Sequence, residues 1–568
     1  MRTVTLPSTP EAFRDGRWED ILPYYEELAV RPLDDVEDWL RDWSRLESLL
    51  GEAHTLASIR YTSDTTDPEW EDRYLRFSAD VGPKAGEQSV RLGRRLVESG
   101  HSRAGLETAV RRFRNSIDLF REENVPLQGE LSKLNARHQK LTGAMTVEWD
   151  GQEMTPMQLR PYIAAADRSV RERAWRLHYQ PYIDQRDEMA AIFDAQYELR
   201  QRSARNAGFA NYRDYAHRQR NRFDYTSDDC LRWHEAVELT AVPAAKRILD
   251  RHRREFGLDV LRPWDVEYNP DSLGRPPLKP FAETSVLADR AGRMFERVDP
   301  ELGRHFQTMM EEELLDLDSR KGKAPGGYCT SLPFRERPFI FMNSAGVDGD
   351  VKTLLHEAGH AFHSFETMAA QPLVWQRTYG SEMAEVASMS MELLAGRYLE
   401  ESAGGLYSPE EARRSRIQHL EGIVLFFGHC ASVDAFQHWI YTDPLGADRD
   451  ARDRKWLELR SRFQRGVDWS GLDAQRVARW YAQLHIFLHP FYYIEYGIAQ
   501  LGALQVWRNA LRDQRAAVSA YRGALALGGS RPLPELYEAA GARLVFDAAG
   551  MSELIDLCES ELDRLIKD

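Results

Sequence analysis

Amphipathic helical periodicity runs through most of this chain of 568 residues. Apolar residues recur at three- and four-residue spacing with charged residues between them, and glycine and proline are rare within these stretches. The sequence therefore predicts a mainly α fold, with helices over residues 20–60, 68–100, 101–140, 156–205 and 226–256 and from residue 351 almost to the end.

Three stretches interrupt the helical pattern. Residues 145–155 alternate around Asp150-Gly151, which predicts a tight β-hairpin. Residues 269–280 are rich in proline and predict a surface loop. Residues 321–350 are rich in glycine and proline, and they contain one clear strand candidate, Phe339 to Asn343.

Composition narrows the class of protein. Hydrophobic residues make up 42% of the chain, which is enough to bury a large core. The formal net charge of −15 argues against nucleic acid or an anionic membrane as a partner, because both repel an acidic surface. The length predicts more than one packed unit, and we expect an N-terminal helical domain over 1–185 and a catalytic domain over 186–568.

The expected compartment is the cytoplasm. The N-terminus has no apolar signal-peptide core, and no run of 18 apolar residues exists, so neither secretion nor membrane insertion is predicted. The cysteines form no C-x-x-C pair and suggest neither a disulfide framework nor a thiolate metal site; they are Cys230, Cys329, Cys430 and Cys558.

A histidine cluster, "LHEAGHAFHSFE" at 355–366, carries the chemistry. His356 and His360 are four residues apart, so on a helix both imidazoles project from one face and can bind one Zn²⁺. Glu357 is rotated around the helix, where it can act on water as a general base. The alternative is a pair of structural histidines, but small and apolar neighbours predict a buried helix, in which a metal is a good partner for imidazole.

Two histidines leave a catalytic zinc site incomplete, because such sites usually have three protein ligands. A second predicted helix, residues 381–394, places several carboxylates within reach. Its small residues Ala384, Ala387 and Ser388 would let it approach the first helix closely. The spacing alone leaves five candidates for the third ligand: His363, Glu366, Glu382, Glu385 and Glu392.

These motifs resemble a known family. "HEAGHAFHS", followed 29 residues after His356 by Glu385 within "AEVAS", resembles the thimet oligopeptidase and oligoendopeptidase F metallopeptidases, and the similarity is closer to oligoendopeptidase F. Upstream, "KAPGGYCTSLP" and "PFIFMNSAG" resemble the family's glycine-rich loop and the strand beside the metal. Downstream, "HIFLHPFYYIEYG" resembles its histidine and tyrosine segment.

The resemblance implies an architecture and a site. The family fold has two helical lobes enclosing a deep substrate channel, with a small β element beside the zinc. One zinc ion per chain would be held by His356, His360 and Glu385, with Glu357 as the base. Tyr492, Tyr496 and His485 would donate hydrogen bonds to the reacting oxygen, and His489 competes with His485 for its role. The strand at 339–343 is expected to pair with the substrate backbone.

The sequence therefore predicts a zinc-dependent oligopeptidase that hydrolyses internal peptide bonds of short, unstructured peptides. A zinc carboxypeptidase on the same fold is the nearest alternative, and the sequence does not separate the two. A non-catalytic peptide-binding protein and a helical scaffold with a structural histidine cluster are alternatives from other classes. Side-chain preference, physiological substrate and oligomeric state stay open.

Overall fold

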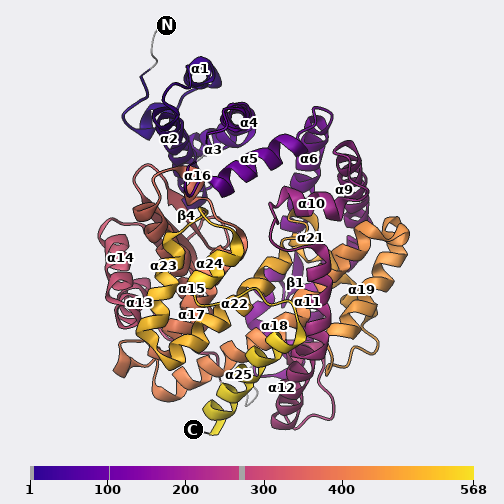
Figure 1. Cartoon of the computed structure of the whole chain (residues 1–568). Coiled ribbons are helices and arrows are strands. Elements are labelled where there is room, and N and C mark those ends of the chain that lie inside the picture. Colours follow the sequence, from indigo (N-terminus) through magenta and orange to yellow (C-terminus); the bar gives the residue numbers. More distant parts are fainter. Residues whose placement is uncertain (1–4, 102, 268–275, 568) are drawn as a thin grey trace. The chain divides into compact units, whose positions relative to one another are not determined.

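The computed structural model describes residues 5–101, 103–267 and 276–567, which are predominantly helical (Figure 1). The prediction of a mainly α fold is confirmed. The contacts of the chain divide it into two compact units that are each built from three separate segments. Unit 1 comprises Met1–Asp118, Lys279–Ala412 and Gly502–Leu544, and unit 2 comprises Leu119–Leu278, Arg413–Leu501 and Val545–Asp568. The predicted boundary between residues 185 and 186 stays a prediction, as does the channel between two lobes.

The residues of unit 1 that the structure describes form helices and three strands. In chain order its elements are α1 (Trp18–Val30), α2 (Val36–Ser63), α3 (Pro68–Arg76), α4 (Gly82–Glu98), α5 (Glu107–Leu119), α13 (Thr284–Val298), α14 (Pro300–Glu311), β3 (Leu315–Asp318), β4 (Tyr328–Leu332), β5 (Arg337–Ser344), α15 (Asp348–Ala370), α16 (Val374–Arg377), α17 (Ser381–Ala395), α23 (Gln514–Ala526) and α24 (Leu533–Ala539). A core of apolar residues surrounds Trp39 and Trp43 of α2, whose side chains are fully buried.

The described part of unit 2 is helical apart from one hairpin. Its elements are α6 (Asn124–Gly143), β1 (Val147–Trp149), β2 (Gln152–Met154), α7 (Arg160–Ile163), α8 (Arg168–Asp184), α9 (Arg186–Asn206), α10 (Tyr212–Gln219), α11 (Ser227–Leu239), α12 (Ala241–Glu255), α19 (Arg449–Phe463), α20 (Asp473–Tyr481), α21 (Leu484–Leu488) and α25 (Ala548–Lys567). A core cluster forms around Trp175 of α8. Two long helices, α18 (Pro409–Thr442) and α22 (Tyr493–Arg512), contribute residues to both units.

The first interruption in the helical pattern, at residues 145–155, has the predicted structure. Strands β1 and β2 form the predicted hairpin, with Trp149 opposite Gln152. Asp150 and Gly151 form its turn with φ values of 51° and 80°, the left-handed conformation that such a two-residue loop requires. The proline-rich stretch 269–280 lies largely outside the described residues. No helix in the described part of the chain is long and apolar enough to cross a membrane.

The predicted strand at 339–343 is confirmed as β5, but its expected role in binding substrate is wrong. The sheet has the order β3-β5-β4, with β3 parallel and β4 antiparallel to β5. Phe341, for example, pairs with Asp316 on one side and Tyr328 on the other. Because β5 is the central strand, both of its edges are already hydrogen-bonded, and a further strand could join only an edge strand, β3 or β4.

Candidate active site

The turn between β5 and α15 sets the start of the helix that carries the histidine cluster. Asp350 in the first turn accepts hydrogen bonds from the backbone N–H groups of Ala345 and Val347, at 2.7 and 3.0 Å. A carboxylate there satisfies otherwise unpaired donors and interacts favourably with the positive end of the helix dipole. The helix then runs from Asp348 to Ala370 and packs against β4, β5, α17 and α23 (Figure 1).

Gly359 lets α15 and α17 approach closely. A Cβ atom built on Gly359 would lie 2.5 Å from Cα of Ser388 and 2.6 Å from the carbonyl oxygen of Ala387. Only glycine fits at such a crossing without movement of the backbone. The close approach expected from the small residues of the second helix is confirmed, and it brings the carboxylates of α17 beside the histidines of α15.

The crossing brings His356, His360 and Glu385 together. Their ligand atoms all lie within 4.8 Å of one another. Oε2 of Glu385 lies 3.3 Å from Nε2 of His356 and 3.8 Å from Nε2 of His360, so one carboxylate oxygen faces both imidazoles. Ser388 holds that oxygen through a hydrogen bond of 3.0 Å. Two imidazoles and one carboxylate converging on one point are a donor set that suits zinc.

Glu392 supports the cluster from behind. Its Oε1 lies 2.7 Å from Nδ1 of His356, which leaves Nε2 of this imidazole facing Glu385. Metal-binding histidines usually donate their second N–H to a carboxylate in this way, which fixes the tautomer and the ring orientation. The sequence analysis listed Glu392 as a candidate ligand, but in the structure it is hydrogen-bonded to the back of His356 instead of facing the other two ligands.

The charges around His356 favour a cation. Burial by itself would lower the pKa of His356, but the hydrogen bonds and charges of Glu385 and Glu392 outweigh it and raise the pKa well above its usual value. Burial lowers the pKa of His360 to about 4, so this imidazole is neutral at physiological pH. A buried carboxylate and a partly buried one beside this imidazole thus favour a positive charge, which either a proton on His356 or a bound metal ion supplies.

Glu357 lies beside the cluster and belongs to α15. Only 8% of its surface is exposed, and burial raises the pKa of Glu357 to about 7. Its carboxylate accepts a hydrogen bond from the backbone N–H of Cys329 on β4, which ties the side chain to the edge strand. A carboxylate with a pKa near neutrality can both accept and return a proton.

The other candidates for the third ligand have other partners or lie elsewhere. Glu366 pairs with Arg522 at 2.6 Å and lies 3.5 Å from His305. His363 is fully buried and stacks on Tyr379 with ring centroids 3.5 Å apart. Glu382 lies at the start of α17, where a Cβ on Gly380 would meet its carboxylate at 2.7 Å.

Unit 2 brings His485, Tyr492 and Tyr496 together. The ring centroid of His485 lies 6.0 Å from that of each tyrosine, and the two tyrosine rings are 5.0 Å apart. All three side chains are partly exposed, whereas His489 is exposed. Tyr493 lies between His485 and His429, with ring centroids 4.9 and 5.3 Å from theirs. The structure therefore places the predicted metal ligands in unit 1 and the predicted hydrogen-bond donors in unit 2.

Arginines hold the segment that carries these donors, and the sequence analysis missed them. Arg220 donates to the carbonyl oxygen of Pro490 at 3.0 Å, and Arg222 donates to that of Phe491. Both guanidinium groups also bond Oε1 of the buried Glu495, at 3.3 and 2.8 Å. Phe491 is fully buried with a positive φ of 62°, a strained conformation that these contacts help to hold. Long-range contacts to backbone carbonyls leave no sequence motif.

A second cluster of possible metal ligands was also missed. His217, Cys230 and His438 have ligand atoms within 4.8 Å of one another in unit 2. They come from three helices and are spread over more than 200 residues, so no local spacing connects them.

Comparisons with known proteins agree with this fold. The chain is 23% identical over 390 residues to oligopeptidase PepF of Bacillus subtilis, a match that covers 67% of this chain and 55% of that protein. PZ peptidase A, solved with an inhibitor, shares 26% identity at a TM-score of 0.86, with 99% of each chain covered. Oligoendopeptidase F from Enterococcus faecium has the same fold at 15% identity and a TM-score of 0.64, with 98% of this chain and 99% of that chain covered.

Models of protein families identify the chain more directly. The model of the peptidase M3 N-terminal domain matches residues 19–116. The model of peptidase family M3 matches residues 162–554, which include both groups of predicted site residues. Because this second match spans more than half of the sequence, the chain belongs to peptidase family M3.

Proposed function

We propose that this chain is a zinc-dependent oligopeptidase that hydrolyses internal bonds of short, unstructured peptides. The observation that carries the proposal is the convergence of His356, His360 and Glu385 beside the buried Glu357. The donor set fits zinc because it supplies two imidazoles and a carboxylate in a place whose charges favour a cation. When bound, the zinc ion acts as a Lewis acid that activates water and polarises the scissile carbonyl.

The residues of the chain would then handle the proton. Glu357 accepts a proton from the attacking water, and it hands this proton to the leaving amine when the peptide bond breaks. The hydrogen bond from the Cys329 N–H orients its carboxylate for both transfers. Glu392 holds His356, and Ser388 holds Glu385, so that the ligands keep their positions during turnover.

The donors of unit 2 would act on the oxygen of the substrate. Tyr492, Tyr496 and His485 are proposed to donate hydrogen bonds to the oxyanion that forms when water attacks the carbonyl. Their clustering on one arginine-held segment supports this assignment. Nδ1 of His485 lies 2.9 Å from Nε2 of Gln483, and because the amide nitrogen is the donor, this contact leaves the proton of the neutral ring on Nε2.

The substrate class follows from the edge strand and the family. An extended peptide could join β4 by main-chain hydrogen bonds, close to the N–H group of Cys329 that contacts Glu357. The named relatives are peptidases that include an oligopeptidase and an oligoendopeptidase, which supports short peptides as substrates of this chain as well.

One experiment tests the proposal. The purified chain is incubated with a mixed peptide library with and without a chelator, and the fragments are identified by mass spectrometry. We expect chelator-sensitive cuts at internal bonds and about one catalytic zinc per chain, which His356→Ala removes. Fragments that differ only by loss of a C-terminal residue would identify a carboxypeptidase. Zinc binding without any cleavage would identify a peptide-binding protein, and cleavage unchanged by both chelator and His356→Ala would exclude the metal mechanism.

A further inference from the structure

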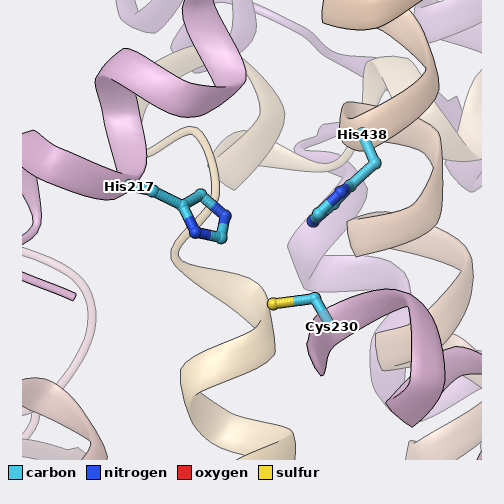
Figure 2. Close-up of side chains that lie close together, drawn as sticks. All are labelled: His217, Cys230 and His438. Carbon is cyan, nitrogen blue, oxygen red and sulfur yellow. The ribbon is translucent and has the colours of Figure 1, made fainter. Parts of the chain in front are cut away.

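Three helices of unit 2 direct metal-binding side chains into one buried space. His217 is on α10, Cys230 is on α11 and His438 is on α18, and Figure 2 shows the two imidazole rings and the cysteine sulfur pointing toward a common centre. Their exposed fractions are 7%, 0% and 3%. One ligand atom from each residue lies within 4.8 Å of the other two.

The separations are close to those around a single ion. Zn–N distances are about 2.0–2.1 Å and Zn–S distances about 2.3 Å, so neighbouring ligand atoms of a tetrahedral site lie roughly 3.5 Å apart. Side-chain rotations that move each ligand atom by about an ångström would therefore bring the three atoms to the separations of a zinc site.

His438 supplies a second observation that points to a ligand. It is almost fully buried, and its Nδ1 has no hydrogen-bond partner among the described residues. Its Nε2 lies 3.3 Å from Oδ2 of Asp434, one turn earlier on α18. A buried imidazole nitrogen without a partner is costly, and a bound metal ion removes that cost.

Asp434 brings negative charge to the same place. Its side chain is fully buried, Oδ2 contacts Nε2 of His234 at 2.8 Å, and Oδ1 has no hydrogen-bond partner in the part of the chain that the structure describes. A divalent cation would be balanced by the Asp434 carboxylate together with a Cys230 thiolate. The nearby positive charge of Arg222 is already balanced by Glu495, at 2.8 Å.

Arg222 competes with a metal for His217. Its Nη1 donates to Nε2 of His217 at 3.1 Å, and a bound ion that uses this nitrogen would displace the hydrogen bond. Arg222 would keep its bonds to Glu495 and to the carbonyl oxygen of Phe491. On metal binding, Arg222 would therefore lose only its hydrogen bond to the neutral His217 ring. Its positive charge would stay paired with Glu495.

We propose that His217, Cys230 and His438 bind a second metal ion, of the zinc class, which ties α10, α11 and α18 together. A thiolate combined with imidazoles favours zinc over magnesium or calcium, which take oxygen ligands. All three side chains are buried, which keeps a peptide substrate away from the ion, so we assign it a structural and not a catalytic role. The proposal is independent of the proposed peptidase function.

Cobalt distinguishes the two sites in one preparation. The full chain is stripped of metal, reconstituted with Co²⁺, and studied by absorption spectroscopy and elemental analysis. Because the proposed catalytic ligands contain no sulfur, a near-ultraviolet thiolate-to-cobalt charge-transfer band reports only the second site. We expect two ions per chain and this band in the wild type. One ion per chain without the band would overturn the proposal.

Matched variants locate the second ion. Cys230→Ser should lose the band and one of the two ions, whereas Cys430→Ser, a change at another buried cysteine of unit 2, should keep both. His356→Ala should keep the band while it loses the other ion. If Cys230→Ser fails to fold, His438→Gln provides the same comparison and should also lose the band. A band that persists in Cys230→Ser or in a folded His438→Gln would place the thiolate ligand elsewhere and overturn the assignment.

Discussion

Glu357 differs from the other carboxylates of the candidate site in what its side chain contacts. Glu385 faces both histidines, and Glu392 bonds one of them, whereas Glu357 bonds the backbone of β4. The same chemical group thus has three roles set by position on two helices. A change that removes only the charge of Glu357 should leave the ligand set intact.

We predict that Glu357→Gln keeps its zinc and its fold but loses most of its activity. The amide is nearly the same size as the carboxylate but cannot accept the proton, so kcat should fall by about 10²- to 10⁴-fold. Zinc content and steady-state rates on one peptide measure both effects. Glu385→Ala is the matched comparison, since it should lose zinc as well as activity. Substantial turnover by Glu357→Gln would remove Glu357 from the role of base.

The raised pKa of Glu357 predicts a pH dependence. The base must be ionised to act, so activity should rise with pH through an acid limb. Burial raises the pKa to about 7 in the metal-free site, and a bound cation lowers it again by favouring the carboxylate. The acid limb of kcat/KM is therefore expected below about pH 7, in a profile measured from about pH 5 to about pH 9. A rate that falls as pH rises over that range would contradict this assignment.

Three tyrosines on one segment allow a controlled test of the proposed oxyanion donors. If Tyr492 or Tyr496 donates to the oxyanion, its replacement by Phe should lower kcat by about a hundredfold with little change in KM. Tyr493→Phe is the comparison, because Tyr493 is not among the predicted donors although its ring lies near both His485 and His429. Steady-state kinetics of the three variants decide the matter. Equal, near-wild-type rates in all three would make the tyrosines packing residues.

At the scale of elements, the sequence correctly predicted the features that depend only on the spacing of residues along one helix. His356 and His360 share a helix face because they are four residues apart, and this holds in any α-helix. The spacing did not decide which of the five candidates is the third ligand, because that depends on where α17 crosses α15. Strands β3 and β4 were missed because they are short and lie in a region rich in glycine and proline, and they are strands through pairing with β5. Non-local pairing of this kind leaves little periodicity in the sequence.

The helix crossing yields a prediction of its own. Gly359→Ala should destabilise the chain by about 1–3 kcal/mol or more, because the new methyl group overlaps Ser388 and Ala387 and pushes α15 away from α17. Zinc affinity should fall too, since Glu385 moves with α17. Gly349→Ala on the same helix is the control: nothing lies within 4 Å of that Cβ position, so it should be neutral. Thermal unfolding and zinc titration measure the effects, and equal behaviour of both variants would contradict the close-crossing interpretation.

At the scale of the whole molecule, the order of segments along the chain does not match their division into compact units. Each compact unit is assembled from three segments, and α18 and α22 run from one unit into the other without a flexible linker. Composition shifts and linkers mark a boundary only where the chain leaves one unit for good. The second ligand cluster shows the same limit, because His217 and His438 come together through helix packing across more than 200 residues.

Substrate size is the property of the whole molecule that the proposed function predicts. A segment that joins the edge strand β4 must be extended and unpaired, and each ordered residue loses about 1–2 kcal/mol of backbone entropy. A folded protein would in addition have to break its own backbone hydrogen bonds. The enclosed channel that the family resemblance implies would further limit the length of chain that can enter.

We therefore expect cleavage of peptides of roughly five to twenty residues and little or none of folded proteins. The measurement compares cleavage rates per site on a peptide of about ten residues and on casein, an unfolded protein that separates the effect of length from that of folding. Slow cleavage of casein would support a limit on length, whereas comparable rates on both would leave folding as the only barrier and contradict an enclosed channel.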